Sequence, residues 1–221
     1  DLKKCMDAID EKSDYRNYEY VIVENNSEQD ETFKFYYEIS KRKNVNVLYW
    51  KDEFNYSAIN NYGVANAKGE YVLLLNNDTE IINSDCLSQM IGYCQREEVG
   101  AVGARLYYED GSIQHAGVVI GFGGIAGHAF VGLREEAGLY QSRTKVACDY
   151  SAVTAACLMT KKSVFEEVGG LEESFKVAFN DIDFCMKIRK SGRLIVYNPN
   201  AKLYHYESKS RGLEDTPEKI E

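Results

Sequence analysis

Residues 69–81 read GEYVLLLNNDTEI, and this stretch decides the fold class. Its centre, Tyr71 to Leu75, is a short unbroken apolar run, which is typical of a strand buried on both faces. The polar residues NND at 76–78 follow at once. The stretch therefore predicts a buried strand with a polar loop at its carboxyl end.

The same alternation extends over residues 1–106. Tyr18 to Val23 is a second apolar run that ends in polar residues at 24–27, and Ser57 to Lys68 is predicted to be a helix with Gly69 as its C-cap. The order helix-strand-strand-helix-strand-helix-strand predicts an α/β fold with a mostly parallel central sheet and helices on both faces. Ligands of such sheets bind at the carboxyl ends of the strands.

The composition excludes several classes of protein. The chain has 221 residues, of which 44% are hydrophobic and 28% charged, so it is neither a disordered chain nor a disulfide miniprotein. Its net charge of −9 argues against a general nucleic-acid binder. No apolar run is long enough to span a membrane. The six cysteines contain no CxxC pair and are predicted to be small buried hydrophobes in a reducing compartment.

Three segments could carry chemistry. Asp78, after the buried strand, could bind a hard divalent cation, although Asx residues in this place are also common turn formers. Asp181 is predicted to lie at a helix N-terminus, where a carboxylate is either a functional anion or only a cap. His205 and Arg211 could contribute a metal ligand and a phosphate contact, or belong to a solvated loop. His115 and His128, which flank a glycine-rich stretch, are interpreted as structural.

Taken together, these segments make the chain resemble the family 2 glycosyltransferases of the GT-A fold, especially those of bacterial surface-polysaccharide (O-antigen or rhamnan-like) assembly. The resemblance extends from about Leu2 to Gly212 and rests on four stretches: FNYSAINNYGVANAKGEYVLLLNNDTEI (54–81), DGSIQHAGVVIGFGGIAGHAF (110–130), SAVTAACLMTKKSVFEEVGGLEESF (151–175) and FNDIDFCMKIRKSGRLIVYNPNAKLYHYESKSRG (179–212).

The resemblance implies a role for each matching position. Asp181 stands where the family has its catalytic base, and Asp78 and His205 stand at metal-binding positions. Asn76 replaces the first acid of the family's Asp-x-Asp motif, and Asn180 replaces the first acid of its Glu-Asp pair. The residues implied to contact the nucleotide sugar are Glu24, Asn25, Asn61, Asn76, Asn77 and Arg211, and Thr154 and Ala155 are implied to form a wall where donor and acceptor meet.

The resemblance also implies an activity. It is inverting transfer of a sugar from a nucleotide-diphosphate sugar, with UDP or dTDP favoured, to a saccharide or lipid-linked saccharide acceptor. Mn²⁺ or Mg²⁺ would stabilise the leaving diphosphate. The resemblance also implies that the protein acts in the cytoplasm, including the inner face of the membrane.

Residues 1–221 are expected to form a single domain, with a nucleotide-sugar-binding half (1–106), an acceptor and catalytic half (107–212) and a polar tail (213–221). Family members normally begin with a strand before the helix that starts here at Leu2. The resemblance therefore implies a sheet that lacks this first strand and a fragment of a longer polysaccharide-assembly protein. Two other functions stay open: a non-catalytic GT-A module that binds nucleotide sugars or carbohydrate, and a sugar-1-phosphate nucleotidyltransferase.

Overall fold

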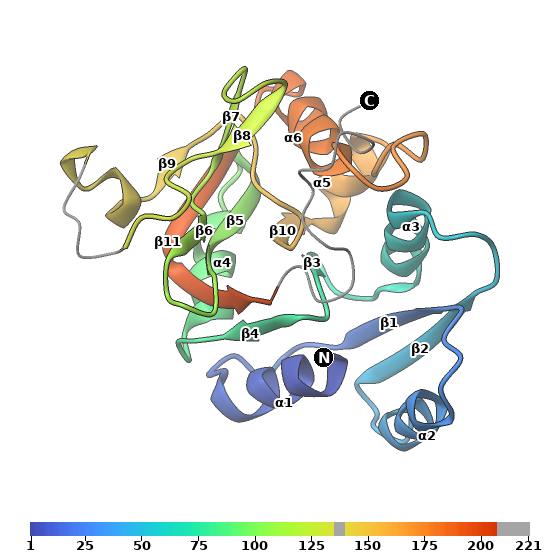
Figure 1. Ribbon diagram of the computed structural model, residues 1–221. Helices are drawn as coiled ribbons and strands as arrows, with labels where there is room; N and C mark the ends of the chain where they lie inside the picture. Colours follow the sequence, from blue (N-terminus) through green and yellow to red (C-terminus); the bar gives the residue numbers. More distant parts are fainter. Residues whose placement is uncertain (135–139, 207–221) are drawn as a thin grey trace.

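A computed structural model describes residues 1–134 and 140–206 of the chain (Figure 1). The helices are α1 (Leu2–Lys12), α2 (Asp30–Ile39), α3 (Tyr56–Asn66), α4 (Cys86–Cys94), the 3₁₀ helix η2 (Tyr140–Lys145), α5 (Lys162–Glu167) and α6 (Asn180–Lys190). The strands are β1 (Tyr20–Asn25), β2 (Val45–Trp50), β3 (Tyr71–Leu75), β4 (Thr79–Ile81), β5 (Val99–Tyr107), β6 (Ile113–His115), β7 (Val118–Ile120), β8 (Ala126–His128), β9 (Cys148–Asp149), β10 (Cys157–Lys161) and β11 (Leu194–His205).

The central sheet follows the order β3-β10-β5-β11-β4, with β6 and β9 added beside it. Strands β5 and β11 pair in parallel, and β10 lies antiparallel between β3 and β5. The long strands β3, β5 and β11 therefore run in the same direction and bring their carboxyl ends to one edge, as the sequence predicts. The shorter strands β4 and β6 pair antiparallel with the carboxyl ends of β11 and β5 and extend that edge, whereas β9 pairs antiparallel with the first half of β11.

Helices cover both faces of this sheet, which confirms the predicted layering (Figure 1). On one face, the core contains side chains of α3, α5 and α6, including the fully buried Phe184 and Ile188. On the other face, α1 and α4 supply Ile9, Met90 and Cys94. Strand β5 is buried along its whole length because it lies between the two cores.

Strands β1 and β2 form a separate parallel pair. Within the described residues, β1 has no strand partner on the side of β3, and the space between them belongs to a cavity of about 1020 Å³. Apolar residues of both strands line this cavity, among them Val21, Val23, Leu73 and Leu75. The β1–β2 pair is therefore separated from the central sheet by this cavity.

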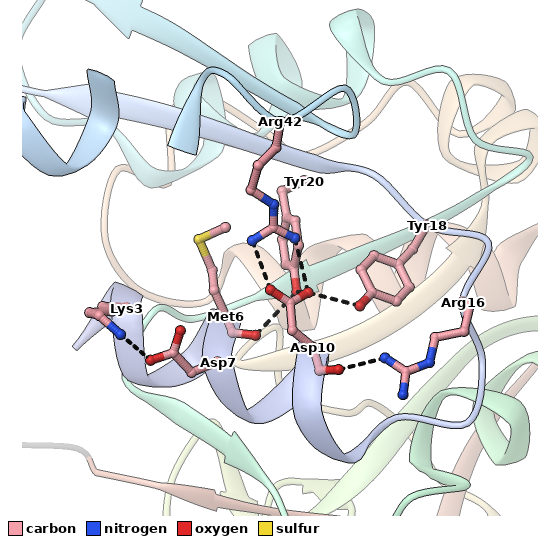
Figure 2. Close-up of polar contacts among 8 residues, drawn as sticks. All are labelled: Lys3, Met6, Asp7, Asp10, Arg16, Tyr18, Tyr20 and Arg42. Atoms are coloured by element: carbon pink, nitrogen blue, oxygen red, sulfur yellow. Dashed lines mark hydrogen bonds and ion pairs between the residues drawn. The ribbon is translucent and has the colours of Figure 1, made fainter. Parts of the chain in front are cut away.

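A polar cluster fastens α1 to the β1–β2 pair (Figure 2). Arg42 donates to both oxygens of Asp10, at 2.7 and 3.0 Å, and the hydroxyls of Tyr18 and Tyr20 donate to the same carboxylate at 2.9 and 3.0 Å. Partial burial acts to raise the pKa of Asp10, but the Arg42 and tyrosine donors outweigh it and hold that pKa below its usual value. The ionised carboxylate thus joins α1, β1 and the turn after α2.

Two local predictions are wrong. Helix α2 lies between the first two strands, where none was expected; its buried Tyr36 and Ile39 share one face, and Asp30 begins it. Helix α3 ends at Asn66 rather than at a Gly69 cap. The chain leaves the helix early because the backbone amides of residues 68 and 69 donate to the carboxylate of Glu19, at 2.5 and 3.2 Å.

Over residues 1–134 and 140–206, no helix combines the length and the apolar character needed to cross a bilayer.

Candidate active site

The loop after β3 and the end of β11 bring the predicted metal ligands together. Strand β4 pairs with β11 so that Thr79 lies opposite His205, and this register places Asp78 beside the histidine ring. His205 Nε2 lies 3.3 Å from Asp78 Oδ1 and 3.2 Å from Asn76 Nδ2. His205 is buried, whereas Asn77 is exposed.

This pair fits a hard divalent cation. A carboxylate oxygen is a good ligand for both Mn²⁺ and Mg²⁺, whereas an imidazole nitrogen suits Mn²⁺ better than the harder Mg²⁺. Among the described residues, no group of three His, Cys, Asp or Glu side chains lies close enough to form a complete metal site. Ions of this kind are commonly held by one or two side chains together with substrate phosphates. Asp78 and His205 could therefore hold a cation whose remaining ligands come from a diphosphate and water.

The predicted base lies at the start of α6. Asp181 is the second residue of the helix, and its Oδ2 accepts a hydrogen bond from Ala155 N at 3.3 Å. Burial raises the pKa of Asp181 above its usual value, although the amides of Ala155 and Ile182, the charge of His128 and the Thr154 hydroxyl oppose the shift. A carboxylate with a raised pKa is a stronger proton acceptor while it remains ionised.

The segment before β10 connects these two groups. Ala156 accepts a hydrogen bond from the backbone amide of Asn76 at 3.0 Å, while its neighbour Ala155 donates to Asp181. The hydroxyl of Tyr56, on α3, donates to the carbonyl of Ala155 at 3.2 Å. The predicted wall at 154 and 155 therefore stands between the candidate metal ligands Asp78 and His205 and the base candidate Asp181.

The cavity described above reaches the candidate metal ligands Asp78 and His205. Its lining includes Asn76, Asn77, Asp78 and His205 as well as Asn60. The other predicted site residues within the described chain, namely Glu24, Asn25, Asn61, Thr154, Ala155 and Asp181, are not among its lining residues.

Three of the residues predicted to contact the nucleotide sugar, namely Glu24, Asn25 and Asn61, make hydrogen bonds to other parts of the protein. Both oxygens of the buried Glu24 accept hydrogen bonds from Ser27, at 2.6 and 2.7 Å. Asn25 donates to the carbonyls of Trp50 and Asp52 at 3.2 and 3.0 Å. These contacts shape the loop after β1 and fasten it to the end of β2.

Asn61 fastens α3 to the segment after α5. It donates to the Leu171 carbonyl and accepts from the Leu171 amide, at 2.9 Å in both cases, and also donates to Glu173 at 3.0 Å. Its neighbour Asn60, which lines the cavity, was not predicted. Arg211 lies outside the described residues.

Sequence reasoning also missed Gln114. This buried residue of β6 lies with its Oε1 2.8 Å from Nδ1 of His205. The sequence marks only the neighbouring His115 as a candidate, and the short strand Ile113–His115 has no pattern that indicates a role for Gln114. The interpretation of His115 as structural agrees with its complete burial, which together with His128 keeps its pKa well below the usual value.

Comparisons with known proteins concern the family and the fold of this chain. The family model described as glycosyl transferase family 2 matches residues 1–169. The chain is 49% identical over 220 residues to an uncharacterized protein, y4gI, of Sinorhizobium fredii, covering 99% of this chain and 24% of that protein. It is 36% identical over 218 residues to the O-antigen biosynthesis protein RfbC of Myxococcus xanthus, covering 98% of this chain and 17% of that protein.

The chain thus spans about a quarter or less of the length of these two relatives. Among solved structures, GalNAc-T7 in complex with UDP, GalNAc and Mn²⁺ superimposes with a TM-score of 0.75 at 14% identity, covering 98% of this chain and 42% of that one. This likeness shows the GT-A fold. The family match favours glycosyl transfer over the nucleotidyltransferase alternative, and with it the chain belongs to glycosyl transferase family 2.

Proposed function

We propose that this domain transfers a sugar from a nucleotide-diphosphate sugar to a saccharide acceptor with inversion at the anomeric carbon. The observation that carries the proposal is the connection through residues 154–156, which link the Asp78–His205 pair to the base candidate Asp181. A leaving group held on one side of the sugar and a base on the other suit a direct displacement.

Each group has a separate task in this proposal. Asp181 accepts the proton of the acceptor hydroxyl as that oxygen attacks the anomeric carbon. Asp78 and His205 hold a divalent cation, which supplies positive charge to the leaving diphosphate. That local charge lets a chain of net charge −9 bind an anionic donor. In this proposal, residues 1–106 form the nucleotide-sugar-binding half and residues 107–212 form the acceptor and catalytic half.

Similar proteins support the substrate class. GalNAc-T7 binds UDP and Mn²⁺ on the same fold, and RfbC is named for O-antigen biosynthesis. We therefore favour a UDP- or dTDP-linked donor and a saccharide or lipid-linked saccharide acceptor, in the synthesis of a cell-surface polysaccharide. A cytoplasmic site of action, including the inner face of the membrane, follows from that role.

A thermal-shift screen of UDP, dTDP and GDP with Mn²⁺ tests the donor site. The matching nucleotide at about 100 times its dissociation constant should stabilise the domain by about 2.7 kcal/mol. That corresponds to a rise in melting temperature of about 5–10 °C for a chain of this size. EDTA should abolish the rise, because the diphosphate is held through the cation.

A rise that persists in EDTA would contradict the metal site at Asp78 and His205. No rise with any nucleotide would contradict the donor site. Binding with no transfer to any acceptor would favour the non-catalytic module.

A further inference from the structure

The side chain of Gln114 makes two contacts with a single residue, His205. Its Oε1 lies 2.8 Å from the ring nitrogen Nδ1, and its Nε2 donates to the His205 carbonyl at 3.4 Å. An amide nitrogen can only donate to a carbonyl, so this second contact fixes which end of the Gln114 amide faces the ring. The oxygen faces Nδ1, and Nδ1 must therefore carry a proton.

The other ring nitrogen has a matching environment. Asn76 Nδ2 lies 3.2 Å from His205 Nε2 and is a donor. This contact is a hydrogen bond when Nε2 carries a lone pair, which agrees with a neutral ring protonated on Nδ1. Two separate amides, from β6 and from the loop after β3, thus favour the same tautomer.

This tautomer has a consequence for the Asp78 carboxylate. Nε2 lies 3.3 Å from Asp78 Oδ1, and both atoms are acceptors when the proton is on Nδ1. Two acceptors at this separation repel each other, and a cation bound by both removes the repulsion. The opposite tautomer would place a proton on Nε2 and block its lone pair.

We propose that Gln114 is a positioning residue, which holds the His205 ring in the Nδ1–H tautomer with the Nε2 lone pair directed toward Asp78. The effect on metal binding rests on the proposed function, whereas the tautomer itself does not. Loss of a hydrogen-bond partner that orients a ligating histidine typically costs 10–100-fold in metal affinity.

Two substitutions separate the orienting contact from simple packing. Gln114→Met keeps the length and the burial of the side chain but removes both hydrogen bonds. Gln114→Glu keeps an acceptor for Nδ1. Gln89→Met is the matched control, since Gln89 donates to Asp85 at 2.8 Å on α4 and has no contact with His205.

The direct readout is the ¹⁵N NMR spectrum of the ring nitrogens, in which only three histidines contribute. A His205→Ala variant assigns the signals. We expect the Nδ1–H form of His205 in the wild type, in Gln114→Glu and in Gln89→Met. In Gln114→Met we expect a mixture of tautomers or the Nε2–H form. The second readout is a titration with Mn²⁺ in the presence of UDP, in which Gln114→Met should raise the dissociation constant by about 10–100-fold.

An Nε2–H tautomer in the wild type, or an unchanged Nδ1–H tautomer in Gln114→Met, would overturn the proposal. The wild-type spectrum decides even if Gln114→Met does not fold. A wild type that binds no Mn²⁺ at His205 would instead refute the metal site of the proposed function, and the tautomers would still test Gln114.

Discussion

Replacing Asp181 by asparagine should lower the rate of sugar transfer by about 10²–10⁴-fold, the range typical for loss of a general base. Asparagine has nearly the same shape and can still accept a hydrogen bond from the amide of Ala155 or Ile182, so the start of α6 should keep its structure. The asparagine amide cannot take the proton of the acceptor hydroxyl. The measurement is the transfer rate at saturating donor and acceptor.

Asp183→Asn is the matched control, two residues further along the same helix. Asp183 pairs with Lys187 at 2.8 Å on a partly exposed surface, and we expect its loss to leave the rate within about twofold, because such pairs contribute little. If Asp181→Asn retained a rate within about tenfold of the wild type, Asp181 would not be the base.

The pH dependence of the wild-type transfer rate is a second test of the Asp181 carboxylate. The base acts in its ionised form, and burial raises the pKa of Asp181. The rate should therefore fall with decreasing pH, with a midpoint above the ordinary range for an aspartate, and this limb should be missing from the residual activity of Asp181→Asn.

Replacing Gly103 by alanine should destabilise the domain by about 3 kcal/mol, at the upper end of the usual cost of overpacking. Gly103 lies in the central strand β5, and a Cβ atom there would lie 2.4 Å from Cβ of Val153. Val153 is fully buried and cannot move aside without shifting Thr154 and Ala155, which contact the base. Urea unfolding should show the loss of stability, and transfer activity should fall with it.

Gly92→Ala is the opposite case and serves as the control. Gly92 lies inside α4, and a Cβ atom at this position would meet no neighbouring atom within 4 Å. Alanine there should stabilise the domain by about 0.5–1 kcal/mol, because it favours the helical backbone. Equal effects of the two substitutions on the free energy of unfolding would contradict the close approach at Gly103.

Local sequence patterns predicted the parts of the fold that depend on local properties. The strand Tyr71–Leu75 and the helix that begins near Asp181 were both predicted, since an apolar run and a helix start with acidic residues in its first turn are visible within a few residues. Helix α2 was missed because its two buried residues, Tyr36 and Ile39, stand among polar and exposed aromatic neighbours.

The site depends on partners that are distant in the chain. Gln114 faces His205 across 91 positions, and no local spacing indicates that contact. Asn61 was assigned to the nucleotide sugar by resemblance, yet its amide joins α3 to Leu171, 110 positions away. Resemblance implies that the chemistry lies at Asp78, Asp181 and His205, whereas the hydrogen bonds show which neighbouring side chains stabilise the protein itself.

The most direct test of the central claim is the amount of Mn²⁺ bound in the presence of UDP, measured from the EPR signal of the free ion. The wild type should show one tight site that depends on the nucleotide, and Asp183→Asn should show the same site. Asp78→Ala should lose it, because the carboxylate and His205 Nε2 form the protein's part of the metal site. An unchanged site in Asp78→Ala would contradict the account.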